Sequence, residues 1–208
     1  MNELTVAFDA LPFARWGPLF QVLCIEHPGI RLEWMAVDFP TRERSLLEGA
    51  DVGLFVAPPE EDGLSALTIE TSEMVVLLAV GHRLSRNHEL RVADIVDEPF
   101  PCGANLRPRG RASWRLGEQR GAPPRPTPTR DHVPDAERWV RVVASGQAIA
   151  TVPATIASGL SHPGVVTVPL ANAPKVATRL VWRSDDDNPL VRALVGLATD
   201  MTRDLRRD

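Results

Sequence analysis

Histidine and cysteine are the side chains whose spacing most directly reveals metal or redox chemistry. The 208 residues include five histidines and two cysteines. No two histidines stand at the i, i+4 spacing that would bring both imidazoles to one face of a helix and let them bind a metal ion; they are His27, His82, His88, His132 and His162. Cys24 and Cys102 lie far apart and form no C-x-x-C pair, so we expect reduced thiols and no metal site.

The motifs that mark catalytic and cofactor sites are missing from the sequence. There is no G-x-G-x-x-G dinucleotide loop, no G-K-[ST] phosphate loop, no G-x-S-x-G nucleophile elbow and no H-E-x-x-H zinc motif. We therefore expect no cofactor and no enzymatic activity. One enzyme hypothesis is kept for comparison, in which Cys102 and His132 would act together.

Charge and hydropathy narrow the class of partner. The formal net charge is −4, with 44% hydrophobic and 24% charged residues; this is ordinary for a globular protein and supplies no overall positive field for nucleic acid or membranes. The start has no secretion signal, and the longest apolar run, Met74–Val80, is far shorter than a membrane span, so we expect a cytoplasmic protein. Seven arginines between Arg107 and Arg130 could serve an anionic ligand or an operator, although solvated loop charge is the simpler explanation.

A helix, a glycine and a short apolar strand follow one another twice in the sequence. The first instance is "LLEGADVGLFVAPP", Leu46–Pro59, and the second is "VVASGQAIATVPAT", Val142–Thr155. A glycine just past a helix can adopt the left-handed conformation, which lets the chain reverse at once into the next strand. Gly49 and Gly146 take this place, so the sequence indicates two similar lobes.

The first quarter of the chain predicts alternating strands and helices. Apolar periodicity indicates strand, helix, strand, helix and strand; the segments are Leu4–Phe8, Trp16–Gly29, Ile30–Ala36, Arg42–Glu48 and Val52–Val56. This order is typical of a doubly wound parallel sheet, in which ligands bind beyond the carboxyl ends of the strands. The buried face of the first helix is expected to carry Leu19, Phe20, Leu23 and Cys24.

Further strands and helices are predicted on both sides of an irregular segment. We expect a strand from Glu73 to Val80, a short helix at 92–97, a strand ending at Cys102, a helix after Pro134, strands at 164–170 and 177–183, and a last helix capped by Asn188. Residues 103–131 are rich in Gly, Pro and Arg, with a helix expected near Arg111–Arg120 and an extended piece near Arg125–Arg130. One apolar stripe of the last helix consists of Leu190, Leu194, Leu197, Met201 and Leu205.

Six segments in this order resemble the effector-binding domain of LysR-type transcriptional regulators. They are "LLEGADVGLFVAPPEEDGL", "VVLLAVGHRLS", "VADIVDEPF", "VVASGQAIATVPA", "GVVTVPL" and "LVWRSDDDNPLVRAL". The resemblance extends from Leu4 to about Ala198. It implies an α/β fold of two Rossmann-like lobes, the type 2 periplasmic-binding-protein fold, joined by two crossover strands.

The resemblance also implies where the lobes divide. The crossings are expected near Leu78–Leu84 and near Val168–Ala173, which gives lobe I residues 1–78 and 172–208 and lobe II residues 79–171. The family's winged helix-turn-helix does not precede Leu4, so the chain is either an excised domain or a protein that lost its DNA reader. We expect DNA contact only through such a domain, and none by the isolated chain.

The family's pattern assigns effector contacts to loops and helix starts in both lobes. Those in lobe I are Asp9, Ala10, Leu11, Phe13, Phe39, Pro40 and Thr41. Those in lobe II are Cys102, Gly103, Asp131, His132 and Thr151. Helix N-terminal amides favour anions and apolar walls favour organic molecules, so a carboxylate or other polar metabolite is the expected effector, bound in the interlobe cleft.

Asp9 departs from the family, because many relatives place a serine or threonine after the first strand. A carboxylate at this position would repel an anionic effector. It would instead cap the helix, pair with an arginine, or contact a cationic or hydroxylated ligand.

Association and function follow from the same resemblance. Family members typically pair as antiparallel homodimers, which here would bring the helix Pro18–His27 against Pro134–Ser145 of a second copy, with Trp139 near the seam. The leading hypothesis is a ligand-sensing regulatory domain of a LysR-type regulator. The alternative is a cytosolic solute-binding or scavenging protein of the same fold, and an enzyme is the third hypothesis.

Overall fold

The computed structural model divides the chain into two compact units. It describes residues 3–8, 13–37, 46, 49–56, 62–100, 116 and 136–204. Unit 1 consists of Met1–Thr71 and Ala177–Asp208, and unit 2 of Ser72–Val176. Each unit has its own sheet and its own buried core.

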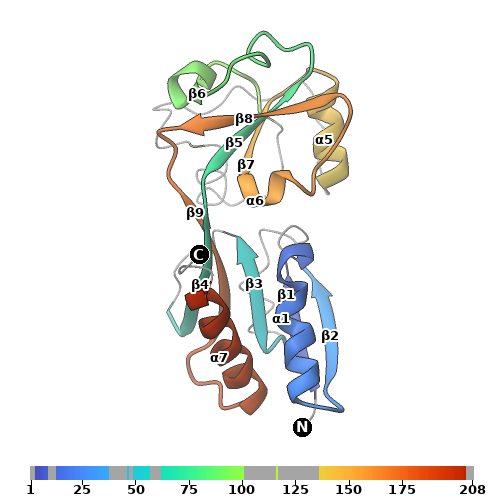
Figure 1. Cartoon of the computed structure of the whole chain (residues 1–208), viewed down its shortest axis with the longest axis vertical. Coiled ribbons are helices and arrows are strands. Elements are labelled where there is room, and N and C mark those ends of the chain that lie inside the picture. Colours follow the sequence, from blue (N-terminus) through green and yellow to red (C-terminus); the bar gives the residue numbers. More distant parts are fainter. Residues whose placement is uncertain are drawn as a thin grey trace. The chain divides into compact units, whose positions relative to one another are not determined.

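Unit 1 contains a five-stranded sheet in the order β2-β1-β3-β9-β4 (Figure 1). Its strands are β1 (Glu3–Phe8), β2 (Arg31–Ala36), β3 (Val52–Val56), β4 (Leu64–Ser72) and β9 (Val176–Arg183). β1 pairs in parallel with β2 and β3, and β9 pairs antiparallel with β3. The parallel arrangement predicted for the first three strands is confirmed, whereas the nine-residue strand β4 was not predicted.

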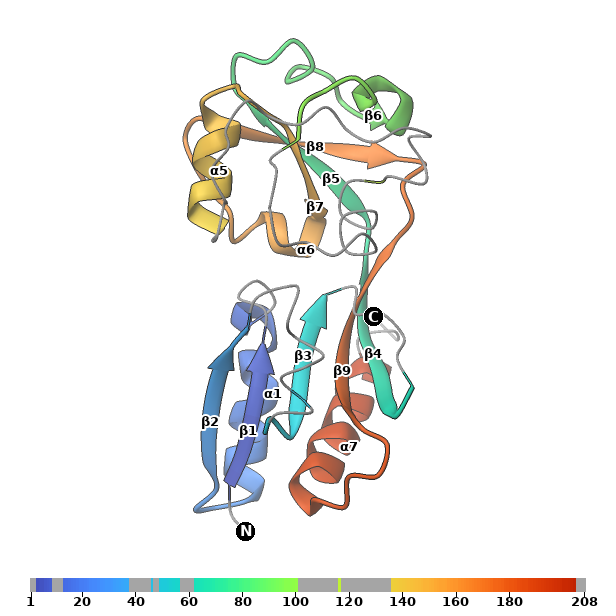
Figure 2. The ribbon, with the colours of Figure 1, turned by 180° about the vertical axis from the view of Figure 1, so that it is seen from behind.

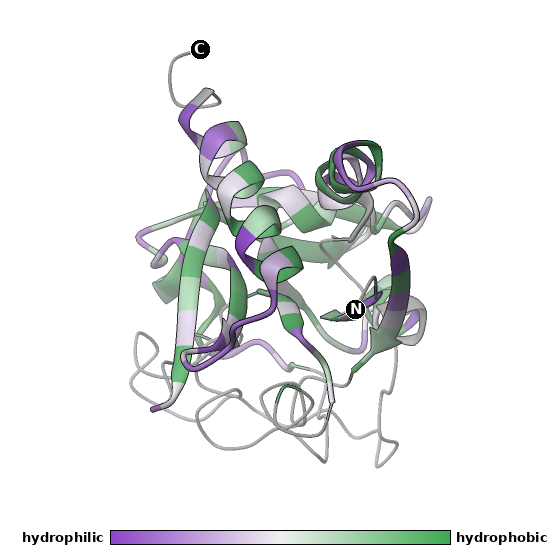
Figure 3. Ribbon diagram, turned by 90° about the horizontal axis from the view of Figure 1, so that it is seen from below, coloured by the Kyte–Doolittle hydropathy of each residue, from purple (hydrophilic) through white to green (hydrophobic). Residues whose placement is uncertain are grey.

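Two helices, α1 (Phe13–Glu26) and α7 (Pro189–Asp204), cover one face of this sheet (Figures 1 and 2). The predicted cap of α7 is confirmed, because Asn188 Oδ1 accepts a hydrogen bond from Leu190 N at 3.0 Å. Hydrophobic and hydrophilic bands alternate along α7 in Figure 3, as expected for a helix with one buried face. Of the predicted stripe, Leu190 and Leu194 are buried, Leu197 and Met201 are partly buried, and Leu205 lies outside the described residues.

The helix α1 differs from its prediction in two ways. It begins at Phe13, ahead of the expected start at Trp16. Leu19, Phe20 and Leu23 are buried as expected, but Cys24 is exposed. Each residue turns a helix by about 100°, which carries the thiol after Leu23 out of the buried stripe.

The strand β3 is buried on both faces of the sheet. Val52 and Leu54 belong to the core under α1 and α7, while Phe55 packs with Leu46 and Ala50 on the other face. Gly49 precedes this strand with φ +133°, and Gly146 in unit 2 has φ +74°. Both glycines therefore adopt backbone conformations that other residues rarely take, as the sequence predicted.

Unit 2 contains a four-stranded sheet in the order β6-β8-β5-β7. Its strands are β5 (Met74–Ala79), β6 (Leu90–Arg91), β7 (Ala150–Pro153) and β8 (Val165–Ala171). β5 pairs antiparallel with β7 and β8, and β6 pairs in parallel with β8. All six residues of β5 are buried, which makes this strand the centre of the second core.

The described residues of unit 2 include the short helices η1 (Val92–Ile95), α5 (Ala136–Ala144) and α6 (Ala154–Ala157). In α5, Val140 and Val143 are buried and Trp139 is partly buried, as the amphipathic pattern predicted. The helix expected near Arg111–Arg120 and the extended piece near Arg125–Arg130 lie outside the described residues, apart from Leu116, which is buried. Within the described part of the chain, no helix is long and apolar enough to cross a membrane.

The chain passes from one unit to the other at two places. The first boundary lies between Thr71 and Ser72, ahead of the expected crossing near Leu78–Leu84. The reason is that β5 already pairs in the second sheet from Met74 onward. The second boundary lies after Val176, beyond the expected 168–173, because β8 pairs within unit 2 as far as Ala171.

The ring of Phe55 occupies the space above Gly53. A Cβ at position 53 would lie 2.2 Å from Phe55 Cε2, and the neighbours of Gly53 in the sheet are Ala7 and Val181. We expect Gly53→Ala to lower the free energy of unfolding by about 1–3 kcal/mol, because the ring must leave its place in a filled core. Urea denaturation measures this change.

Gly196→Ala is the matched control for Gly53→Ala. Gly196 lies on the exposed side of α7, where an added Cβ would meet nothing within 4 Å. Because alanine favours the helix, this change should raise the free energy of unfolding by up to about 1 kcal/mol. A Gly53→Ala protein as stable as the wild type would contradict this account of β3.

Candidate functional site

The carboxyl ends of the three parallel strands of unit 1 lie at one edge of the sheet (Figure 2). Phe8 at the end of β1 is in register with Ala36 of β2 and Leu54 of β3. Val37 N donates to Phe8 O at 3.0 Å, so the two chains leave the sheet next to each other. The predicted effector segments follow Phe8 and Val37 in the sequence, and this edge is where ligands bind in open parallel sheets.

Most of the predicted effector residues of unit 1 are outside the described part of the chain. These are Asp9, Ala10, Leu11, Phe39, Pro40 and Thr41. Phe13 is the first residue of α1, but its side chain is not described. The described residues therefore show only the points, Phe8 and Val37, after which the predicted effector segments begin.

A charged pair lies at the start of α1. Arg15 Nε is 2.6 Å from Glu70 Oε1, near the end of β4. The Arg15 side chain is 54% exposed, whereas that of Glu70 is 11% exposed. The arginine thus meets solvent, and the glutamate that holds it is largely covered.

In unit 2, Thr151 is the predicted effector residue that the structure describes. It is fully buried in β7, opposite Val76 of β5. Ile149 N donates to Pro99 O at 2.9 Å, so the segment that leads to Cys102 starts beside the strand that carries Thr151. Cys102, Gly103, Asp131 and His132 lie outside the described residues.

The residues at which the chain enters and leaves unit 2 are tied to one another. Ser72 Oγ accepts a hydrogen bond from Thr155 N at 3.3 Å, and Glu73 O accepts one from Ala154 N at 2.8 Å. On the exit side, Lys175 Nζ lies 2.5 Å from Glu73 Oε1. The start of α6 and both chain crossings are therefore linked within this unit.

A second cluster of charged residues surrounds Glu98 in unit 2. Its carboxylate contacts Arg83 and, at 3.3 Å, His82 Nε2. His82 Nδ1 accepts a hydrogen bond from Leu84 N at 3.2 Å, so the imidazole is engaged at both nitrogens. Within the described residues no group of three or more His, Cys, Asp or Glu side chains could hold a metal ion.

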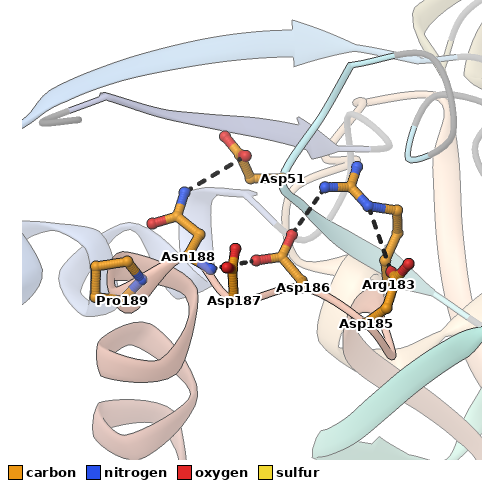
Figure 4. A pocket seen from close by; sticks show the side chains of 7 residues that line it. All are labelled: Asp51, Arg183, Asp185, Asp186, Asp187, Asn188 and Pro189. Atoms are coloured by element: carbon orange, nitrogen blue, oxygen red, sulfur yellow. Dashed lines mark hydrogen bonds and ion pairs between the residues drawn. The ribbon is translucent and has the colours of Figure 1, made fainter.

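An acidic pocket that the sequence analysis did not predict lies at the opposite edge of the sheet of unit 1 (Figure 4). It has a volume of about 390 Å³ and is lined by Asp51, Arg183, Asp185, Asp186, Asp187, Asn188 and Pro189. Asp51 precedes β3 and Arg183 ends the antiparallel strand β9, which places both at the amino-terminal edge of the parallel strands. The signal in the sequence was the run "SDDDNP".

Two carboxylates of this pocket, those of Asp51 and Asp186, already have donors. Asp51 Oδ2 accepts from Thr5 N at 2.7 Å and Oδ1 from Asn188 Nδ2 at 3.5 Å. Asp186, 2% exposed, accepts from Arg183 and from Asn188 N at 3.0 and 2.8 Å. These bonds join β1, the turn before α7 and the end of β9, so the pocket is part of the framework of unit 1.

Removing the Asp51 carboxylate should destabilise unit 1, because the Thr5 amide loses its acceptor inside the structure. We expect Asp51→Ala to lower the free energy of unfolding by about 1–3 kcal/mol. Asp185→Ala is the control, since its side chain is 90% exposed and its ion pair with Arg183 is long, at 3.9 Å. The effect of this change on the free energy of unfolding should stay within about 0.5 kcal/mol. Urea denaturation compares the two, and equal effects would contradict the bridging role of Asp51.

Solved structures with the same fold belong to LysR regulators. The effector-binding domain of BenM with its effector benzoate has a TM-score of 0.78 at 16% identity, covering 96% of this chain and 91% of that one. Full-length CbnR with its target DNA has a TM-score of 0.73 at 19% identity, covering 96% of this chain and 68% of that one. The regulatory domain of MetR from N. meningitidis has a TM-score of 0.66 at 19% identity, covering 94% of this chain and 91% of that one. At these identities the likeness shows the fold.

The family is shown by the sequence itself. No curated protein matches the chain. The family described as the LysR substrate binding domain matches residues 2–203, nearly the whole length. The two α/β units with their two chain crossings agree with the periplasmic-binding-protein-like fold of that family. The chain belongs to the LysR substrate binding domain family.

Proposed function

We propose that this chain senses a small-molecule effector on behalf of a LysR-type transcriptional regulator. The observation that carries the proposal is the family match over residues 2–203. The geometry of unit 1 supports it, because two of the predicted effector segments begin next to each other, after Phe8 and after Val37. The alternative of a scavenging protein without a DNA-binding partner domain has no such support.

The proposed effector contacts are the twelve residues predicted from the family's pattern, contributed by both units. A ligand that contacts both units favours one of their arrangements over the others, and this difference in affinity is what a regulator transmits. The crossing residues Ser72, Glu73 and Lys175 are well placed to respond, because the structure ties them to the start of α6 and to each other.

A carboxylate or other polar metabolite is the proposed effector class. BenM, a structural neighbour, was solved with its effector benzoate, which is a carboxylate. In this chain α1 begins five residues after Phe8 at the carboxyl edge of the sheet, and helix starts favour anions. Asp9 is the residue that opposes an anionic ligand.

The other proposals concern activity, location and DNA. Regulation by binding requires no catalysis, so we propose that the chain is not an enzyme. A domain that controls a DNA-binding regulator works where the DNA is, which in a bacterium is the cytoplasm. Contact with DNA would come from a helix-turn-helix domain, since full-length CbnR, solved with its target DNA, is longer than this chain.

We also propose a homodimer that uses α1 and α5. Two large apolar side chains of unit 1 are exposed: Ile25 of α1 at 75% and Trp34 of the edge strand β2 at 40%. Trp34 is held edge-on by Phe8 and Phe20, with ring centroids 6.1 and 4.9 Å away. A rigid apolar surface of this kind suits an isologous contact with α5 of a second copy.

The effector proposal predicts a ligand-dependent shift in melting temperature. A metabolite present at a hundred times its Kd adds about 2.7 kcal/mol of stability. Thr151→Val and Thr41→Val should weaken the shift without unfolding the protein, and Asp9→Asn should strengthen it if the ligand is anionic. Thr199→Val in α7 is the control, because the acceptor of its hydroxyl among the described residues is Val195 O, within the same helix. Hits unaffected by the first three changes would refute these contacts.

The dimer proposal predicts twice the monomer mass in light scattering at tens of micromolar, about the range expected for a modest interface. Ile25→Asp should shift the protein to monomer, because a carboxylate would be buried without a partner in the contact. Ala66→Asp is the control, since Ala66 is exposed on β4, the edge strand at the other end of the sheet order from β2. A wild-type monomer at these concentrations would reject the dimer.

A further inference from the structure

We propose that Arg15 recognises the negative charge of the effector and that Glu70 positions its guanidinium. This inference rests on the proposed effector-sensing function. It names a contact outside the twelve residues taken from the family's pattern, and it assigns the ligand to the anions.

The position of Arg15 is set by two elements that meet at the carboxyl edge of the sheet. Arg15 is the third residue of α1, which follows β1. Ser184 N donates to Gly63 O at 2.8 Å, so the start of β4 lies beside the end of β9. Because β9 is antiparallel to β3, with Thr178 opposite Val56, the end of β4 lies where β3 ends. Glu70 stands there and contacts Arg15.

The contact with Glu70 engages one nitrogen of the arginine, Nε. Glu70 approaches Nε, at 2.6 Å, and within the described part of the chain it is the acceptor found for Arg15. The two terminal nitrogens carry four N–H groups, on a side chain that is 54% exposed. A carboxylate can accept two parallel hydrogen bonds from these nitrogens, which is the geometry that makes arginine a strong reader of carboxylates.

The neighbouring residue adds to the surplus of donors. Trp16 is only 3% exposed. Its indole Nε1 is buried and has no hydrogen-bond partner in the described chain. Buried N–H groups without an acceptor are uncommon in proteins and call for one. The first turn of α1 therefore contains, beside Arg15, a buried donor for which the described chain supplies no acceptor.

Stability alone does not account for the pair. An ion pair with one exposed partner contributes about 0–1 kcal/mol, so an arginine has little structural reason to occupy this edge. An arginine that binds an anionic effector has a functional reason to be at this edge. Its positive charge offsets the repulsion of an anion by the net charge of −4 and by the carboxylate of Asp9, which follows Phe8 directly. Glu70 contacts Nε and thereby fixes the direction of the guanidinium, on a side chain that is 54% exposed.

The test compares small carboxylates with their neutral amides, beginning with benzoate and benzamide. We expect a carboxylate of the panel to bind the wild-type chain more tightly than its amide in isothermal titration. Arg15→Gln should weaken that carboxylate about 10- to 100-fold, as loss of a charged hydrogen bond does, and leave the amide unchanged. Arg15→Lys should lose part of the affinity, since it keeps the charge without the fork. Glu70→Gln keeps an acceptor for Nε and removes a repelling charge, so carboxylate binding should hold or tighten.

Arg31→Gln is the matched control, with urea denaturation to verify that all variants are folded. Arg31 is 73% exposed and lies 3.9 Å from Glu3, at the opposite edge of the same sheet, so the same loss of charge there should not change carboxylate binding. Equal carboxylate affinity in Arg15→Gln and wild type would overturn the role of Arg15. If only neutral compounds bind, and Thr151→Val weakens their binding, the inference that Arg15 recognises an anion fails and the effector function stands. If no compound of the panel binds the wild type, both fail.

Discussion

The antiparallel pairing of β3 with β9 is the interaction on which the rest of the structure depends. β3 comes from the first part of the chain and β9 from the last, so this pairing joins two distant segments into one sheet, from Val52 opposite Trp182 to Val56 opposite Thr178. Hydrogen bonds that Asp51 accepts from Thr5 and Asn188 close the same junction at the sheet edge. A unit built from both ends of a chain requires the chain to leave and return, which creates the two crossings.

The crossings bring the carboxyl edge of the sheet, where the effector is proposed to bind, and the connection to unit 2 into one region of unit 1. β4 carries Glu70 two residues before its end at Ser72, where unit 2 begins. The ion pair with Arg15 therefore joins the helix that follows the first predicted effector segment to the strand that leads out of the unit. A ligand that bound Arg15 would alter the contact with Glu70, so in this proposal recognition of charge and response of the crossing strand would share one pair of residues.

Features set by local physics could be predicted from the sequence. Gly49 and Gly146 were expected to reverse the chain after helices, and both have positive φ. Asn188 was expected to cap the last helix, and it does. The buried strand Val52–Val56 was visible as an apolar run between a glycine and two prolines. Cys24 was predicted to be buried but is exposed. Adjacent residues of a helix point about 100° apart, and a short apolar pattern does not define the limits of the buried face that closely.

Features set by pairing between distant segments could not be predicted in the same way. β4 alternates weakly between buried and exposed residues, and its place as a strand comes from its position beside β9. The unit boundary falls at Ser72 because β5 finds its partners β7 and β8 far along the chain. The effector segments were carried over by family pattern, loop by loop, and local sequence gives loops little conformational signal. Arg15 and Glu70 are far apart in the sequence and neither stands in a motif, so only the direction of β4 relative to β9 brings them together at the carboxyl edge.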